Sequence, residues 1–358
     1  MRAAPRLVLA LACLLALAPA AAGCGGDSDS GSTSSSDSAE SRPAPPKSAF
    51  PATEGRTLRA VLKATDGRAE LVVSPAALAF YRGENRYPFG VFELDRTQVP
   101  DAEVALYMAK APAPKPGGQA KSGNEGPAAK ANKQALDEPA IGPFPASIES
   151  LVTQPAFRAK TTSDDPDAAT VVYSTELDFP SDGEWVIAAL VKEGGETKGT
   201  VVGSNVVGEF GGVPQPGDLA PQIHTPTVED AGGDLAQIDT RIPPDTQHQV
   251  DYADALGKEP IALLFATPQF CQSRVCGPVV DVAEQVKQEY GDEAAFIHME
   301  IFNDNDPGKG PRPQVRAFNL PAEPYLFAID REGRVSSVLE GAFGPEALTA
   351  AVQKAVAE

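Results

Sequence analysis

Two cysteines, Cys271 and Cys276, are the residues of this chain best suited to do chemistry. The sequence holds four cysteines, and the other two, Cys13 and Cys24, lie in an N-terminal segment typical of export signals. The remaining pair follows an apolar stretch and precedes a stretch with helical spacing. Two close thiols at a strand-to-helix turn can exchange disulfides, hold a permanent disulfide or bind a metal.

The turn would be positioned by an α/β domain over residues 241–358. The continuous apolar run 260–266 predicts a buried central strand, and the apolar spacing of 279–290 predicts the helix after the cysteines. Further elements are predicted in the order strand, short helix, strand, hairpin strand and terminal helix, over 294–301, 314–318, 325–330, 335–338 and 345–356.

This order of elements resembles the thioredoxin fold. Thioredoxins place a cis-proline just before the third strand, beside the cysteines, and Pro324 stands at that place. The resemblance implies thiol–disulfide exchange, in which the more exposed Cys271 attacks a substrate disulfide and Cys276 resolves the mixed disulfide. The start of the following helix, together with Arg274 between the cysteines, would stabilise a Cys271 thiolate.

Several positions depart from the thioredoxin pattern. The active motif there is W-C-x-x-C, whereas this chain has a wider spacing and Phe270 in place of the tryptophan. Phe265 stands where thioredoxins have a buried acid. Glu323 precedes Pro324, and a carboxylate near a thiolate raises the thiolate's pKa. Three interpretations of the pair therefore stay open: a redox pair, a structural disulfide that closes the loop, and a metal site.

The metal interpretation follows a second resemblance, to Sco-type copper chaperones. These are membrane-tethered thioredoxin-fold proteins with two cysteines and a distant histidine, but their cysteines are closer together and their histidine lies much further along the chain. We expect His298 to be a partly buried strand residue, and His224 and His248, in linker-like sequence, to be exposed. No cofactor or metal is therefore expected.

The N-terminus predicts export and a lipid anchor. Two arginines precede an apolar run over 7–18 that is too short to span a membrane comfortably. Residues 19–24, ending in Cys24, resemble the lipobox of bacterial lipoproteins, with Ala21 where leucine is commoner. The resemblance implies that residues 1–23 are cleaved and that lipid is attached at Cys24. The alternative is an ordinary cleaved signal.

Residues 53–210 predict a β-sandwich. Short strand-like segments are separated by turns rich in Gly, Asp and Pro, without a long helical period. A low-complexity insert over 111–139, rich in Ala, Pro, Gly and Lys, interrupts them. The stretch from Phe179 to Trp185 resembles the F-P-x-x-G-x-W pattern of exported immunoglobulin-like domains, which implies that type of sandwich. The strand-like segments cover 69–73, 87–94, 103–108, 169–173, 185–191 and 199–203.

Two further segments are expected to connect these parts: a disordered Ser-rich tether over 24–52 and a linker over 211–240. The formal net charge of −19 becomes −21 once the signal and its two arginines are removed (−19 − 2). That charge argues against nucleic acid or an anionic membrane surface as the binding partner.

These features predict a lipoprotein anchored to the cell membrane and facing outside the cytoplasm. Its function would be thiol–disulfide exchange on exported proteins that contain thiols or disulfides, with Cys271, Cys276 and Pro324 as site residues. The alternatives are a non-enzymatic binding or scaffold protein with a permanent disulfide, and a copper chaperone. An oxidising location would allow the cysteine pair to persist as a disulfide.

Overall fold

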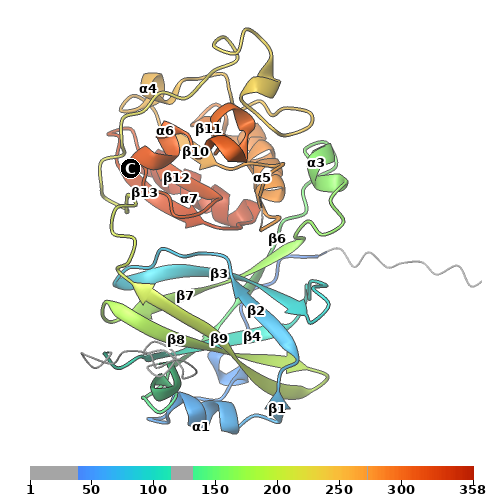
Figure 1. Cartoon of the computed structure of the whole chain (residues 1–358), viewed down its shortest axis with the longest axis vertical. Helices are drawn as coiled ribbons and strands as arrows, with labels where there is room; N and C mark the ends of the chain where they lie inside the picture. The colour runs from blue at the N-terminus through green and yellow to red at the C-terminus, as the bar shows by residue number, and fades with distance from the viewer. Residues whose placement is uncertain (1–38, 114–131, 272) are drawn as a thin grey trace, which may run out of the picture. The chain divides into compact units, whose positions relative to one another are not determined.

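The computed structural model of the chain describes residues 39–113, 132–271 and 273–358 (Figure 1). The expected signal peptide and the expected lipid attachment at Cys24 lie outside the described residues. Contacts group the described residues into one unit, which contains a β-rich lobe and an α/β lobe. None of the helices in the described part of the chain is both long and apolar enough to cross a membrane.

The β-rich lobe consists of two mostly antiparallel sheets. One sheet has the strand order β1-β9-β8-β4-β5 and the other has the order β2-β3-β7-β6. The strands are β1 (Gly67–Arg68), β2 (Leu71–Pro75), β3 (Gly83–Glu93), β4 (Glu103–Lys110), β5 (Ile141–Pro145), β6 (Ser147–Ser150), β7 (Val171–Phe179), β8 (Gly183–Glu193) and β9 (Glu196–Val207).

The two sheets pack face to face, because both contribute side chains to one core. Tyr87 of β3 belongs to the same buried cluster as Leu106 of β4, and the rings of Phe179 and Trp185 are 5.8 Å apart. Aromatic side chains bury large areas and favour such tilted contacts. Trp185 is therefore a core residue of a β-sandwich.

Parts of the segments expected to be unstructured pack onto this lobe. Arg42 forms a β-bridge with Ile148, and Phe50 is 4% exposed, so the expectation of a tether over 24–52 is wrong for its last residues. Within the insert, Asp137 forms an ion pair with Arg59 at 2.6 Å. Burying a phenylalanine side chain contributes about 1.5–3 kcal/mol, which offsets part of the entropy lost when the segment is ordered. Residues 114–131 of the insert lie outside the described residues. The short helices of this lobe are η1 (Lys47–Ala49), α1 (Leu58–Lys63) and α3 (Lys160–Ser163).

The α/β lobe has the thioredoxin-like topology that its sequence predicts. Its sheet has the order β11-β10-β12-β13, in which β10 and β11 are parallel and the other pairs are antiparallel. Its elements are η2 (Leu235–Gln237), α4 (Tyr252–Ala255), β10 (Ile261–Phe265), α5 (Cys276–Tyr290), β11 (Ala295–Met299), η3 (Asn303–Asn305), η4 (Pro307–Lys309), α6 (Pro313–Ala317), β12 (Tyr325–Ile329), β13 (Val335–Glu340) and α7 (Pro345–Ala357).

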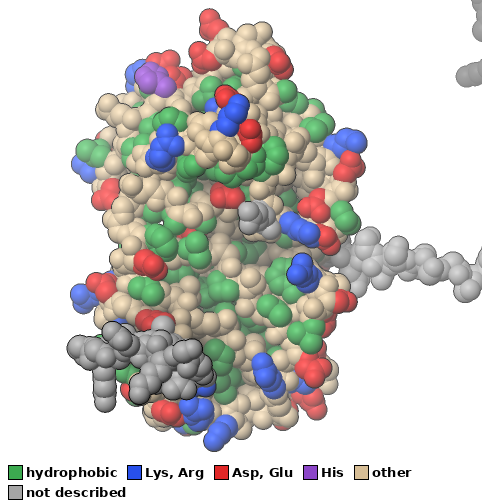
Figure 2. All heavy atoms as spheres, viewed as in Figure 1, with side chains coloured by type: hydrophobic (Ala, Val, Ile, Leu, Met, Phe, Trp, Pro, Cys, Tyr) green, Lys and Arg blue, Asp and Glu red, His purple; other side chains and the backbone are tan. Residues whose placement is uncertain are grey.

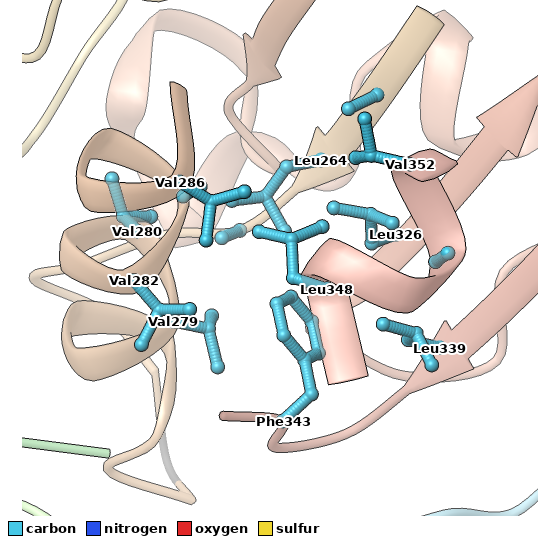
Figure 3. Close-up of a cluster of buried hydrophobic side chains, with 14 of the residues drawn as sticks. Leu264, Val279, Val280, Val282, Val286, Leu326, Leu339, Phe343, Leu348 and Val352 are labelled. Carbon is cyan, nitrogen blue, oxygen red and sulfur yellow. The ribbon is translucent and has the colours of Figure 1, made fainter. Parts of the chain in front are cut away.

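Both faces of this sheet are covered, which explains the unbroken apolar runs of β10 and β12. On one face, helices α5 and α7 pack through Val279 and Leu348 against Leu264 and Leu326 of the strands (Figure 3). On the other face lies a second cluster of buried side chains, which includes Phe265 and residues from the segment before α4. The sheet is therefore a rigid base for the loop that leaves β10.

The expected linker over 211–240 packs against the α/β lobe along much of its length. Val213 and Ile238 are buried, and Leu219 forms a β-bridge with Arg334. The hydroxyl of Thr225 accepts a hydrogen bond from the backbone N–H of Tyr252 at 2.9 Å. Since these contacts satisfy backbone groups and bury apolar side chains, the segment belongs to the lobe, and the expectation of a linker there is wrong.

The two lobes share direct hydrogen bonds at the end of β13. The Glu340 carboxylate accepts the backbone N–H groups of Leu78 at 2.6 Å and Ala79 at 3.1 Å. The next residue, Gly341, has a φ of 73°, and a Cβ at this place would collide with the carbonyl oxygen of Ala76. Glycine is required here both for its backbone conformation and for this close approach.

Burial raises the pKa of Glu340 to about 7. A raised pKa means that the contribution of this carboxyl to stability is fully present below about pH 4.5 and is lost as the pH rises through about 7. Between pH 4.5 and 8, the wild-type protein should lose unfolding free energy on the order of 2 kcal/mol because of Glu340, discounted for partial exposure. The Glu340→Gln variant should not show this loss. Denaturant unfolding across this range measures it. The exposed Glu346→Gln is the matched control, and an equal pH slope in both variants would contradict the assignment.

Candidate functional site

The two cysteines form a disulfide at the start of helix α5. Their Cα atoms are 5.9 Å apart, within the ordinary range for a disulfide. Cys276 is the first residue of α5 and is fully buried, whereas Cys271 lies in the preceding loop and is partly exposed. The sulfur that can meet a second protein is therefore that of Cys271.

The start of α5 provides a donor to this sulfur. The Cys271 Sγ accepts a hydrogen bond from the backbone N–H of Cys276 at 3.3 Å and lies 3.2 Å from the hydroxyl oxygen of Ser273. Unpaired N–H groups and the helix dipole favour negative charge at this end of a helix. Both features would stabilise a thiolate on Cys271 once the disulfide is opened.

Arg274 does not supply the free positive charge that its place between the cysteines predicts. Its guanidinium forms an ion pair with Asp167, and its side chain is 48% exposed. Its backbone is left-handed, with a φ of 59°, and its carbonyl accepts the N–H of Ala169 at 3.3 Å. The structure thus uses Arg274 to hold the cysteine loop against the β-rich lobe, and Asp167 offsets its charge.

Pro324 lies directly before strand β12, and the peptide bond between Glu323 and Pro324 is cis. Pro324 is buried, and its carbonyl accepts the backbone N–H of Gly341 at 2.9 Å. Burial raises the pKa of the Glu323 carboxyl. A carboxyl that is more readily protonated repels a neighbouring thiolate less than an ordinary carboxylate would.

Two surface pockets are linked to the cysteine loop: one contains Phe302, whose ring contacts Phe270 of the loop, and the other is lined in part by the loop itself. One, of about 600 Å³, is lined by residues that include Phe302, Leu320 and Glu323. The ring of Phe270, the residue before Cys271, has its centroid 6.4 Å from that of Phe302. The other pocket, of about 520 Å³, is lined by Ser273–Val275 and by residues of the β-rich lobe. On the face shown in Figure 2, acidic and basic side chains are interspersed without a large patch of one sign.

The histidines do not join the cysteines. His248, expected to be exposed, is 1% exposed, and that expectation is wrong. His298 is fully buried, and its Nδ1 lies 2.6 Å from Asp245 Oδ2. His224 is exposed, as expected, and pairs with Asp251. In the described part of the chain, the group of side chains close enough to hold an ion contains no cysteine, so the geometry does not support the copper-chaperone alternative.

Residues 239–248 contain candidate metal ligands that the sequence pattern did not reveal. Asp239, Asp245 and His248 come from this segment, and with His298 of β11 they form that buried group. The available signal was three potential metal ligands within residues 239–248. It was easily missed because the segment has no helical or strand periodicity, and polar residues in such sequence are mostly exposed.

Comparisons with known proteins give structural likenesses only. No protein-family model matches the chain, and no curated protein sequence matches it. A solved structure of a putative thiol:disulfide interchange protein DsbE from Chlorobium tepidum is 18% identical, covering 40% of this chain and 99% of that chain with a TM-score of 0.29. A putative protein disulfide isomerase from Bacteroides thetaiotaomicron is 15% identical, covering 41% of this chain and 92% of that chain with a TM-score of 0.30. The thioredoxin-like assignment rests on the strand order and directions described above.

Proposed function

We propose that this chain is a lipid-anchored protein outside the cytoplasm that exchanges disulfides with exported proteins. The observation that carries the proposal is the asymmetric disulfide at the start of α5, in which Cys271 is partly exposed and Cys276 is buried. The lipid anchor at Cys24 and the immunoglobulin-like character of the β-rich lobe are parts of the proposal that rest on sequence motifs alone.

The exchange proceeds in two balanced steps. In the reducing direction, the Cys271 thiolate attacks one sulfur of a client disulfide, and the other client sulfur leaves as a thiolate. The Cys276 thiolate then attacks Cys271 Sγ, which releases the second client thiolate. The client disulfide is reduced to two thiols, and the cysteine pair is oxidised to the disulfide seen here. The oxidising direction is the reverse sequence.

A client chain could be held beside Cys271 by the pocket that includes Phe302 and Glu323. The ring of Phe270 connects the cysteine loop to this pocket. Apolar side chains with a few polar groups are the usual lining of such sites. By its resemblance to thioredoxins, Pro324 would pack beside the cysteines and the bound client.

The main alternative is a structural disulfide in a non-enzymatic scaffold protein. Cys276 belongs to the hydrophobic core of the α/β lobe, which favours this view. However, the closed loop is short, with a sequence separation of 5, so the entropic contribution of the bond is about 2 kcal/mol. Reduction is therefore expected to lower the unfolding free energy by about 2 kcal/mol without unfolding the protein.

The reduction potential of the Cys271–Cys276 pair tests the proposal. Exchange proteins lie between about −120 and −270 mV, whereas structural disulfides lie below about −300 mV. We expect a value in the first range, measured by equilibration of the full chain with glutathione or dithiothreitol buffers. We also expect Cys276→Ser to accumulate mixed disulfides with exported proteins, and the control Cys271→Ser to accumulate none.

A potential below about −300 mV, together with no mixed disulfide in the Cys276→Ser variant, would overturn the exchange function. That result would leave the disulfide as a staple of the cysteine loop. Because the two measurements use different forms of the protein, a failure of one through misfolding does not decide the other.

A further inference from the structure

Four ionisable side chains meet in the interior of the α/β lobe, apart from the disulfide. Asp239, Asp245 and His248 come from the segment before α4, and His298 comes from β11. Each is at most 2% exposed, and one potential ligand atom from each lies within 4.8 Å of the others. Burying two carboxylates costs several kcal/mol per charge unless a positive charge compensates for them.

Each histidine faces both carboxylates. His298 Nδ1 lies 2.6 Å from Asp245 Oδ2 and 3.9 Å from Asp239 Oδ1. His248 Nε2 lies 3.3 Å from Asp245 Oδ1 and 3.5 Å from Asp239 Oδ2. The two rings are 5.3 Å apart between centroids. Two nitrogens and two carboxylate groups therefore converge on one small volume.

His248 supplies an observation that is independent of the acidic pair. It is 1% exposed, and neither of its ring nitrogens makes a hydrogen bond within the described part of the chain. Its Nε2 nevertheless points between the two carboxylates. A buried polar group without a partner is costly and rare in native proteins. A cation bound between the carboxylates would give this nitrogen its missing partner.

The orientation of His298 is compatible with a metal ion at the same place. Its Nε2 lies 3.2 Å from the carbonyl oxygen of Ala266. A carbonyl can only accept, so Nε2 carries the hydrogen, and a neutral ring then presents the lone pair of Nδ1 to Asp245. A lone pair facing a carboxylate oxygen requires a proton or a metal ion between them. Metal-binding histidines commonly donate their other N–H to a carbonyl or carboxylate in this way.

Backbone groups hold the two carboxylates in place. Asp239 accepts the N–H of Arg241 at 2.7 Å and the N–H of Asp245 at 2.6 Å. Asp245 accepts the N–H of Gln247 at 2.8 Å. These bonds fix the directions of the carboxylate oxygens. With two neutral histidines the group carries a charge of −2, which a divalent cation neutralises.

We propose that Asp239, Asp245, His248 and His298 form a closed, four-coordinate zinc site that ties residues 239–248 to strand β11. Imidazole nitrogens and carboxylate oxygens are ordinary zinc ligands, and four protein ligands with no open position are typical of structural sites. The two nitrogens disfavour calcium and magnesium, which prefer oxygen ligands alone. The site is independent of the proposed disulfide exchange.

The test uses the full chain without a histidine tag and with its cysteines oxidised, so that no thiolate of the pair can bind metal. After chelation and dialysis against zinc chloride, elemental analysis should find one zinc per chain more than in the His248→Gln variant. His248→Gln should weaken zinc binding by at least about 10- to 100-fold, the loss known even for outer-shell partners. The ring of His248 makes no hydrogen bond with the described residues, so this variant removes a ligand without breaking a side-chain hydrogen bond. The isosteric Asp239→Asn is the second variant, and the exposed His224→Gln is the matched control.

Two further measurements keep the result decisive. Zinc should raise the melting temperature of the chelated protein and of His224→Gln by several degrees, but not that of His248→Gln. The zinc absorption edge should show nitrogen and oxygen neighbours, including imidazole, and no sulfur. Binding of no zinc by the folded protein, equal binding by His248→Gln, or sulfur neighbours would overturn the proposal. In the first case protons, rather than a metal ion, hold the four side chains together.

Discussion

Replacing Cys271 with alanine is expected to abolish disulfide exchange and to leave Cys276 almost inert, whereas replacing Cys276 should leave a reactive Cys271. Cys276 is fully buried in the core of the α/β lobe and can react only after local opening. Cys271 is partly exposed and accepts an N–H from the start of α5. With 5,5′-dithiobis(2-nitrobenzoic acid), we expect Cys271 to react at least about 100-fold faster than Cys276.

Both single-cysteine proteins need a background in which Cys13 and Cys24 are replaced by serine, so that each carries one thiol. Neither should turn over a disulfide substrate, because the second step requires both sulfurs. Adding guanidinium chloride should equalise the two rates, which shows that the difference comes from the fold. Equal rates in the folded proteins would contradict the division of roles between the two cysteines.

Replacing Arg241 with methionine is expected to lower the free energy of unfolding by about 3–5 kcal/mol. Arg241 and Asp281 are both buried, with 3.0 Å between Arg241 Nε and Asp281 Oδ1. The guanidinium also donates to the carbonyls of Pro243 and Phe157 at 2.9 and 2.6 Å. Burial raises the pKa of Asp281 even beside Arg241, so without Arg241 this carboxyl either remains an uncompensated buried charge or must bind a proton, and both cost stability.

The second-site variant Arg241→Met/Asp281→Asn should recover part of this loss, because asparagine is neutral and can still accept the N–H of Ala159. Arg59→Met is the matched control. Arg59 forms an ion pair of 2.6 Å with Asp137, but both side chains are exposed, so a much smaller loss than in Arg241→Met is expected. Chemical denaturation of the four proteins measures the difference. Similar losses in Arg241→Met and Arg59→Met would contradict the role of burial.

The sequence predicts the α/β lobe closely because its strands are continuous and apolar. Strands β10, β11 and β12 are buried at every residue; β10 and β12 are unbroken hydrophobic runs, and β11 is interrupted only by His298. Helix α5 begins at Cys276, before the apolar spacing that predicts it becomes regular at Val279. Helix starts depend on caps and turns, which periodicity does not report.

Strands β5 and β6 and the segment 239–248 have no hydrophobic pattern that predicts them from the sequence. Strand β5 contains Pro143 and Pro145, which disfavour strands, and β6 carries polar residues such as Glu149. Segment 239–248 buries Asp239 and His248 without any period, because its side chains bond to backbone and to each other. Its burial follows from tertiary contacts with β11, which lies far along the chain. The disulfide site could therefore be predicted from sequence, whereas the four-residue cluster could not.

The junction at Gly341 limits how either lobe could be combined with a different domain. Its backbone meets the carbonyl of Ala76, and the adjacent Glu340 accepts two N–H groups from the same turn of the β-rich lobe. A recombination event that attached the α/β lobe to a different domain would have to reproduce both the close approach and the pair of donors. Grafting either lobe onto an unrelated protein would therefore require redesign of this junction.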